Sequence, residues 1–288
     1  MMTSLEKVLP VTTKFELGES LTDEQMRFFG VYGFLHFEQV ASPDEVAGII
    51  SEVNRISGEW EREGRTMVNG IPLFWGRDHD GSRFLQRLAF TSRFSDFISE
   101  FVLDSRFEPI RKMIGEDARV GELEKDGVVF NSYMNTPRST RKRLGWHTDG
   151  LRDIFYLRMP VQMLNVGLHL DDVTESDGGL RLIPGTHEQG FLDMCFRKAH
   201  FIAHDTDKAE ICVETKAGDL TIHDGRLWHR VARSSRRGKV SLRRTMFVPY
   251  LTGPYEPKNT RSKTPAYHTL GQAIRFVRDS ASLALRRA

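Results

Sequence analysis

The first hundred or so residues carry the apolar spacing of amphipathic helices. Ser42 followed by Pro43 and Glu45 is a helix start signal, because the serine caps the first turn, the proline fits it and the glutamate completes a capping box. Val46 and Ile49 then begin an apolar stripe that recurs at helical spacing. The pattern therefore predicts a helix that starts at Pro43 and packs one face on the rest of the protein.

Three more elements are expected in this part of the chain. Thr22 and Gln25 form a second capping box, which predicts a short helix. Residues 31–37 read as a strand, and residues 91–115 have aromatic and aliphatic side chains at helical spacing. We expect a mostly helical buttress over residues 1–119.

From about residue 120 the period changes from helical to strand-like. Short β-like runs are separated by Gly and Pro clusters, a pattern typical of a β sandwich or barrel. The predicted strands are 128–134, 161–170, 180–183, 217–223 and 240–249. Helices followed by strands predict a mainly β fold with flanking α-helices. We expect one domain over residues 1–288, with its β core at 120–250 and a basic extension at 251–288.

Composition adds limits to this picture. The chain has 288 residues, 39% of them hydrophobic and 28% charged, as in an ordinary globular protein. It has two cysteines, too few for a disulfide framework, and no apolar run as long as a membrane span. We expect a cytoplasmic protein.

The net charge of +2 conceals a strong asymmetry. Residues 226–288 contain 15 Lys and Arg against 2 Asp and Glu, a balance of +13, so residues 1–225 carry 2 − 13 = −11. The last part, residues 265–288, reads as a basic amphipathic helix. Such a helix can lie on an anionic membrane surface, or it can dock on its own domain or on a second subunit of a homo-oligomer. The sequence does not choose between membrane contact and docking on protein.

The first candidate chemistry is a pair of metal-binding side chains, His147 and Asp149, in the run W-H-T-D-G. Residues two apart on a strand point to the same side, so the two could hold one ion. His169 and Asp171 form a second pair with the same spacing. The spacing alone does not choose between the two pairs.

A third ligand, His229, favours the first pair. The run G-D-L-T-I-H-D-G-R-L-W-H predicts a strand that ends near His229. Two histidines and one carboxylate on a face form the facial triad of non-haem Fe(II) oxygenases, which leaves positions open for O2 and a cosubstrate. The usual cosubstrate, 2-oxoglutarate, has a distal carboxylate that suits an arginine. Arg243 and Arg244 follow on the next predicted strand, and only one of them can face inward.

At these residues the sequence resembles the phytanoyl-CoA dioxygenase family of Fe(II)/2-oxoglutarate oxygenases. The resemblance covers about residues 20–250, and the order and spacing of its motifs make it specific. The motifs are L-T-D-E-Q with F-F and Y-G-F-L-H, then W-H-T-D, then L-D-D-V-T-E-S-D-G-G-L-R-L-I-P-G-T-H, and finally G-D-L with H-D-G-R-L-W-H.

The resemblance implies a double-stranded β-helix, or jelly-roll, core. It also implies that His147, Asp149 and His229 bind Fe(II), with 2-oxoglutarate and O2 as cosubstrates. The family's arginine falls on Arg243, but 14 residues separate it from His229, which is longer than the common spacing. Arg244 therefore remains an alternative for binding the distal carboxylate of 2-oxoglutarate.

Other polar residues near the predicted strands were also considered. Tyr133, Asn135 and Asn165 could contact the cosubstrate, although ordinary strand-end hydrogen bonding explains them equally well. His223 lies six residues before His229; on one regular strand the two would share a face, so His223 could support the metal ligands or simply be a core histidine. His169 with Asp171, His187 in P-G-T-H and Trp146 are expected to be structural.

The predicted activity is hydroxylation of an unactivated C–H bond in a small substrate. The basic loop at 138–143 and the charged C-terminal part favour an anionic substrate, such as a sugar acid of lipopolysaccharide, a lipid or an acyl derivative. The rival hypotheses are a jelly-roll protein that binds metal or ligand without catalysis, and a zinc hydrolase. The chain has no recognised nucleic-acid-binding motif, so no nucleic-acid partner is expected.

Overall fold

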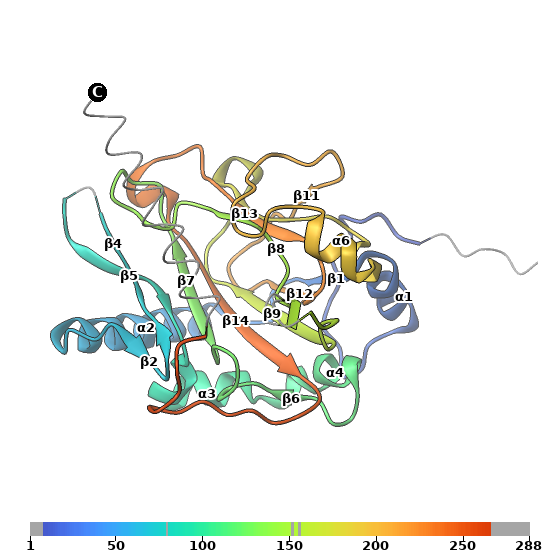
Figure 1. Cartoon of the computed structure of the whole chain (residues 1–288), viewed down its shortest axis with the longest axis horizontal. Helices are drawn as coiled ribbons and strands as arrows, with labels where there is room; N and C mark the ends of the chain where they lie inside the picture. The colour runs from blue at the N-terminus through green and yellow to red at the C-terminus, as the bar shows by residue number, and fades with distance from the viewer. Residues whose placement is uncertain (1–7, 79, 151–152, 155–156, 266–288) are drawn as a thin grey trace, which may run out of the picture.

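Two antiparallel β-sheets lie face to face in the computed structural model, which describes residues 8–78, 80–150, 153–154 and 157–265. Helices lie outside the larger sheet, and in Figure 1 α2, α3 and α4 run along the lower side of the molecule. This arrangement confirms the mainly β fold with flanking helices that the sequence pattern predicts, and the jelly-roll core that the family resemblance implies.

The larger sheet contains strands from both halves of the chain. In spatial order it holds β1 (Phe34–Phe37), β12 (Leu220–Asp224), β9 (Met163–His169), β14 (Arg243–Leu251), β7 (Val129–Tyr133), β5 (Arg83–Leu88) and β4 (Phe74–Arg77), with β6 (Arg119–Val120) paired to β14. The long β14 crosses the centre of the view beside β7 (Figure 1).

The smaller sheet carries the candidate metal ligands. Its order is β11 (Ile211–Cys212), β10 (Gly179–Leu182), β13 (His229–Ala232) and β8 (Leu144–His147). A separate two-stranded hairpin is formed by β2 (Met67–Val68) and β3 (Ile71–Pro72).

The first two helices begin where their capping residues predict. They are α1 (Asp23–Tyr32), α2 (Pro43–Arg62), α3 (Asp96–Val102), α4 (Glu108–Arg111) and α6 (Phe191–Phe196). Short 3-10 turns lie at Thr91–Phe94, Ser105–Phe107, Lys112–Ile114, Glu175–Asp177, Thr186–Glu188 and Gly238–Ser241. Both predicted capping boxes are present, at Thr22 and at Ser42.

The two faces of the larger sheet differ in polarity because side chains alternate along each strand. On β14, Met246 and Val248 point outward and join the buried apolar cluster that includes residues of α2 and α3. Arg243 and Thr245 point the other way, into the space between the sheets. The main hydrophobic core therefore lies between sheet and helices. The interior of the jelly roll has a mixed lining, with Arg243, Tyr133 and His169 beside Leu180, Val231 and Phe247.

The structure differs from the predicted elements in several places. The strand expected at 31–37 begins only at Phe34, because Gly33 adopts a left-handed conformation that ends α1. Residues 67–88, within the part expected to be mostly helical, contain β2 to β5. The helix expected over 91–115 is broken into α3, α4 and 3-10 turns. Finally, His223 and His229 lie on two strands of different sheets, so they do not share one strand.

The predicted amphipathic helix at 265–288 falls almost entirely outside the described residues, so its contact with a membrane or a second subunit stays a prediction. Within the described ranges, no helix is both long and apolar enough to cross a membrane.

Candidate metal centre

His147 and His229 lie opposite each other on neighbouring strands of the smaller sheet. His147 is the last residue of β8, His229 is the first residue of β13, and the two are direct register partners. Asp149 follows two residues after β8 ends, and its backbone N–H donates to the carbonyl of Gly225 at 2.7 Å. That bond fixes the turn after β8 against the turn that joins β12 to β13.

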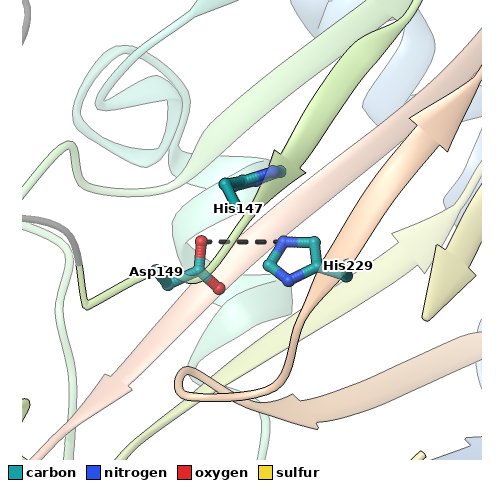
Figure 2. Close-up of side chains that lie close together, drawn as sticks. All are labelled: His147, Asp149 and His229. Carbon is teal, nitrogen blue, oxygen red and sulfur yellow. Dashed lines mark ion pairs between the residues drawn. The ribbon is translucent and has the colours of Figure 1, made fainter. Parts of the chain in front are cut away.

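The three side chains come close enough to bind one ion. One potential ligand atom from each of His147, Asp149 and His229 lies within 4.8 Å of the others. His229 Nε2 is 3.8 Å from Asp149 Oδ1, and the two imidazole rings are 4.1 Å apart between centroids. Figure 2 shows the side chains gathered around this point. Among the described residues, this is the cluster of His, Cys, Asp or Glu with metal-binding spacing.

Backbone hydrogen bonds orient both rings for metal binding. His147 Nδ1 is 2.8 Å from the carbonyl oxygen of Gly145, and His229 Nδ1 is 3.0 Å from that of Leu227. A carbonyl oxygen can only accept, so Nδ1 carries the proton in each ring and donates it. The lone pair is then on Nε2, which is the arrangement that metal-binding histidines require.

The surroundings also set the protonation states that a metal needs. Burial, together with the neighbouring His229, lowers the pKa of His147 well below its usual value. Burial likewise lowers the pKa of His229 to about 4. Burial alone would raise the pKa of Asp149, but His229 and His223 beside it hold that pKa far below the ordinary range. At neutral pH the cluster is two neutral imidazoles and one carboxylate, ready to bind a cation without losing protons.

The second oxygen of Asp149 is held by two residues of the larger sheet. Asn165 Nδ2 donates to Asp149 Oδ2 at 3.0 Å, and His223 Nε2 lies 3.2 Å from the same oxygen. Asn165 was expected to contact the cosubstrate, and in the structure its amide nitrogen contacts this carboxylate. His223 is 1% exposed and supports the cluster from a different strand than predicted.

Arg243 points into the interior of the jelly roll. It is 4% exposed, and its Nη1 and Nη2 donate to the carbonyls of Ala232 at 2.7 Å and Lys142 at 3.2 Å. Its Nε is buried and has no hydrogen-bond partner within the described part of the chain. The side chain lines a cavity of about 30 Å³ between the sheets, with Tyr133 also in the wall. Burial lowers the pKa of Arg243 to about 10, so it remains a cation at neutral pH.

Arg244 has the opposite surroundings. Its guanidinium binds both oxygens of Asp171, with Nε to Oδ2 at 2.9 Å and Nη2 to Oδ1 at 2.5 Å.

Asn135 also has its partners within the protein, because its amide donates to the carbonyls of Ser234 and Arg236 and accepts from Arg233. Of the residues considered for the cosubstrate, Arg243 and Tyr133 line the cavity and the other three form internal bonds.

The remaining candidates occupy ordinary structural positions. His169 Nε2 is 2.9 Å from the hydroxyl of Thr221, and burial lowers the pKa of His169 to about 3. His187 lies buried in a 3-10 turn against Phe29. Trp146 is fully buried and donates its indole N–H to the carbonyl of Asp205. These contacts agree with the structural roles expected for them.

One neighbour of the metal ligands was not anticipated from the sequence. Phe201 stacks on the ring of His147, with centroids 4.7 Å apart and planes at 30°. It is 41% exposed, so it also reaches the surface beside the cluster. No local motif marks Phe201, because 54 residues separate it from His147. Only the folded chain brings the two rings together.

Arg243 contacts β13 at a point away from the two histidines. Arg243 bonds to the carbonyl of Ala232, which lies three residues along β13 from His229. A strand rises roughly 3.3 Å per residue, which makes the separation along β13 about 10 Å.

Comparisons with known proteins point to one family. The family model for phytanoyl-CoA dioxygenase (PhyH) matches residues 29–238. The probable alpha-ketoglutarate-dependent hypophosphite dioxygenase of Stutzerimonas stutzeri is 25% identical over 59% of this chain, a match that spans 55% of that protein. Phytanoyl-CoA dioxygenase 1 of Oryza sativa subsp. japonica is 24% identical over 73% of this chain and 83% of its own length. The solved structure of the non-haem alpha-ketoglutarate-dependent carbocyclase SnoK from nogalamycin biosynthesis superposes with a TM-score of 0.59 at 19% identity, over 86% of this chain and 91% of that one.

Proposed function

Because the chain belongs to the phytanoyl-CoA dioxygenase family, we propose that it is an Fe(II)- and 2-oxoglutarate-dependent dioxygenase that hydroxylates a small molecule. Its metal ligands in this proposal are His147, Asp149 and His229. The observation that carries the proposal is the convergence of these three groups, in the protonation states that a cation needs. Arg243 is buried in the same jelly-roll core.

The donor set fits iron. Two imidazole nitrogens and one carboxylate oxygen form the facial arrangement of non-haem Fe(II) oxygenases and leave positions open. When bound, Fe(II) supplies the redox chemistry by which O2 and 2-oxoglutarate are consumed together. The balanced reaction converts a substrate C–H, O2 and 2-oxoglutarate into C–OH, succinate and CO2.

Arg243 is our candidate for binding the distal carboxylate of 2-oxoglutarate. Its unpaired Nε lies beside the cavity and is a donor without an acceptor among the described residues. A buried cation with a free donor favours an anion, and charge-assisted hydrogen bonds are stronger than neutral ones. Tyr133 lies close to the guanidinium, 5.7 Å from ring centroid to Cζ, and forms part of the same wall. The pairing of Arg244 with Asp171 supports Arg243 rather than Arg244.

We further propose that the substrate carries an anionic group. Exposed arginines lie on the loops that follow β7 and β13, at Arg138, Arg143, Arg236 and Arg237. Hypophosphite and CoA esters, which the names of two relatives contain, are themselves anions. Phe201 adds an exposed apolar surface next to His147. A sugar acid, a lipid or an acyl derivative combines these features.

Succinate release tests the proposal. Purified protein with Fe(II), 2-oxoglutarate and O2 is given acyl-CoAs, sugar acids, amino acids and lipid extracts in turn, and succinate is measured. We expect one class to stimulate succinate formation, and we expect His229→Ala to abolish it. The matched control is His36→Gln, since His36 is a buried histidine paired to Asp219 and lies outside the cluster. Turnover that proceeds without O2, as in a zinc hydrolase, or that survives in His229→Ala would refute the proposal.

A further inference from the structure

Asn165 and His223 act together on a single atom, the Oδ2 oxygen of Asp149. We propose that this pair is a positioning device that keeps Asp149 bound to the metal through Oδ1 alone. The inference rests on the proposed metal site and goes beyond it, because it assigns a task to two residues that do not bind the metal. The proposed task is to set how many positions around the metal ion are occupied by protein atoms.

The geometry of the pair is specific. Asn165 on β9 and His223 on β12 are direct register partners in the larger sheet, so their side chains leave adjacent backbone positions on the same face. Their nitrogens lie 3.0 and 3.2 Å from Asp149 Oδ2. Asp149 itself belongs to the other side of the jelly roll, after β8. The contact therefore joins the two sheets at the metal ligand.

The two oxygens of Asp149 have different surroundings as a result. Oδ2 accepts two hydrogen bonds, whereas Oδ1 faces the imidazole of His229 at 3.8 Å from Nε2. A carboxylate oxygen has about two lone-pair sites, so Oδ2 is saturated by these donors. Oδ1 is the oxygen left for a cation.

This division has a consequence for catalysis. If His147, His229 and one oxygen of Asp149 held the metal ion, three positions would stay open. The cosubstrate needs two of these and O2 needs one. A carboxylate that bound through both oxygens would fill one of the three. By holding Asp149 Oδ2 away from the metal, Asn165 and His223 would keep that position open for O2.

The chain contains a matched contact that serves as a control. His36 Nε2 lies 2.9 Å from Asp219 Oδ2, and both side chains are almost fully buried. This pair has the same chemistry as His223 with Asp149, although the Asp219 side chain is 1% exposed and that of Asp149 is 20% exposed. Asp219 is not among the residues that converge on the metal site. Loss of a buried histidine–carboxylate contact can thus be separated from loss of control over a metal ligand.

Anaerobic titration with Co(II), followed by the visible absorption of the ion, tests the inference. The variants are Asn165→Leu, which keeps the shape and removes the donor, and His223→Phe, with His223→Gln to restore a donor. We expect Asn165→Leu and His223→Phe each to weaken Co(II) binding by about 10–100-fold. The absorption spectrum should also change, because the coordination number of the ion rises. His223→Gln should recover most of the affinity and the wild-type spectrum. His36→Phe should lower the melting temperature and leave Co(II) affinity and spectrum unchanged.

The outcomes separate the two proposals. Wild-type protein that fails to bind Co(II), or binds it equally well after His147→Ala, refutes the metal site itself. Wild-type protein that binds Co(II) while Asn165→Leu and His223→Phe keep its affinity and spectrum refutes the positioning role alone. If His223→Phe does not fold, Asn165→Leu decides by itself, because Asn165 is only half-buried.

Discussion

Adjacent residues in this protein have opposite surroundings, and the difference decides which of them is available for chemistry. Arg243 and Arg244 follow each other on β14, and strand geometry sends them to opposite faces. Arg243 Nε lies beside the interior cavity and has no acceptor among the described residues, whereas the guanidinium of Arg244 binds Asp171. The sequence predicted the alternation but could not tell which arginine faced inward.

Substitution of these two arginines should therefore affect different quantities. Arg243→Leu removes a charge-assisted contact worth about 1.5–3 kcal/mol, so the KM for 2-oxoglutarate should rise by roughly 10–100-fold. Arg244→Leu should leave that KM near the wild-type value and lower the melting temperature, because Asp171 loses its partner. Steady-state kinetics with varied 2-oxoglutarate measures both. A large rise in KM for Arg244→Leu alone would reverse the assignment.

His169 makes a separate prediction about acid stability. Its pKa is lowered to about 3 by burial, whereas the unfolded chain protonates it near 6.5. Between these values the unfolded state binds the extra proton, so this group's contribution to stability is complete above pH 6.5 and falls as pH drops toward 3. The loss is about 1.4 kcal/mol per pH unit.

Urea unfolding of metal-free protein at pH 6.5 and pH 4.5 measures this effect. Wild-type protein should lose about 2–3 kcal/mol more than His169→Gln over that interval. The glutamine variant keeps a hydrogen-bonding group near Thr221 but cannot titrate. Equal losses in the two proteins would show that His169 does not contribute to acid sensitivity.

At the scale of elements, Gly33 joins α1 to β1 in a way that only glycine allows. Its φ is +76°, and a Cβ added there would lie 2.4 Å from Nδ1 of His187. Gly33→Ala should therefore destabilise the fold by about 2–4 kcal/mol, from backbone strain and overpacking. Gly58→Ala is the matched control, since Gly58 lies in α2 with open space around it and alanine should stabilise by about 0.5–1 kcal/mol. Thermal unfolding checks both, and a neutral Gly33→Ala would be contrary to this account.

Elements marked by local signals could be predicted from the sequence, whereas contacts between distant segments could not. Start signals for α1 and α2 were correct because capping boxes are local. The strands β2 to β5 at 67–88 were missed, since short strands with charged residues lack a clear period. Local spacing gave both the His147 and Asp149 pair and the His169 and Asp171 pair, and the run that leads to His229 favoured the first. The contacts of Asn165, His223 and Phe201 depend on sheet pairing and loop packing between distant segments, which local patterns do not encode.

At the level of the whole molecule, the two sheets contribute different residues to the candidate metal centre. The smaller sheet provides the two histidines and leads into Asp149, while the larger sheet provides Arg243 and the pair that holds Asp149 Oδ2. Arg243, for which we propose a role in binding 2-oxoglutarate, is one of the 15 Lys and Arg in residues 226–288. The substrate class, the membrane contact of the C-terminal segment and a homo-oligomer stay predictions.

The central claim is that His147, Asp149 and His229 bind Fe(II) with 2-oxoglutarate in the interior of the jelly roll. Anaerobic difference absorption of the protein with Fe(II) and 2-oxoglutarate tests it most directly, because the ternary complex has a weak visible charge-transfer band and needs neither substrate nor O2. We predict that wild-type protein shows the band and that folded His147→Ala does not. Absence of the band from folded wild-type protein, or its persistence unchanged in His147→Ala, would contradict the account.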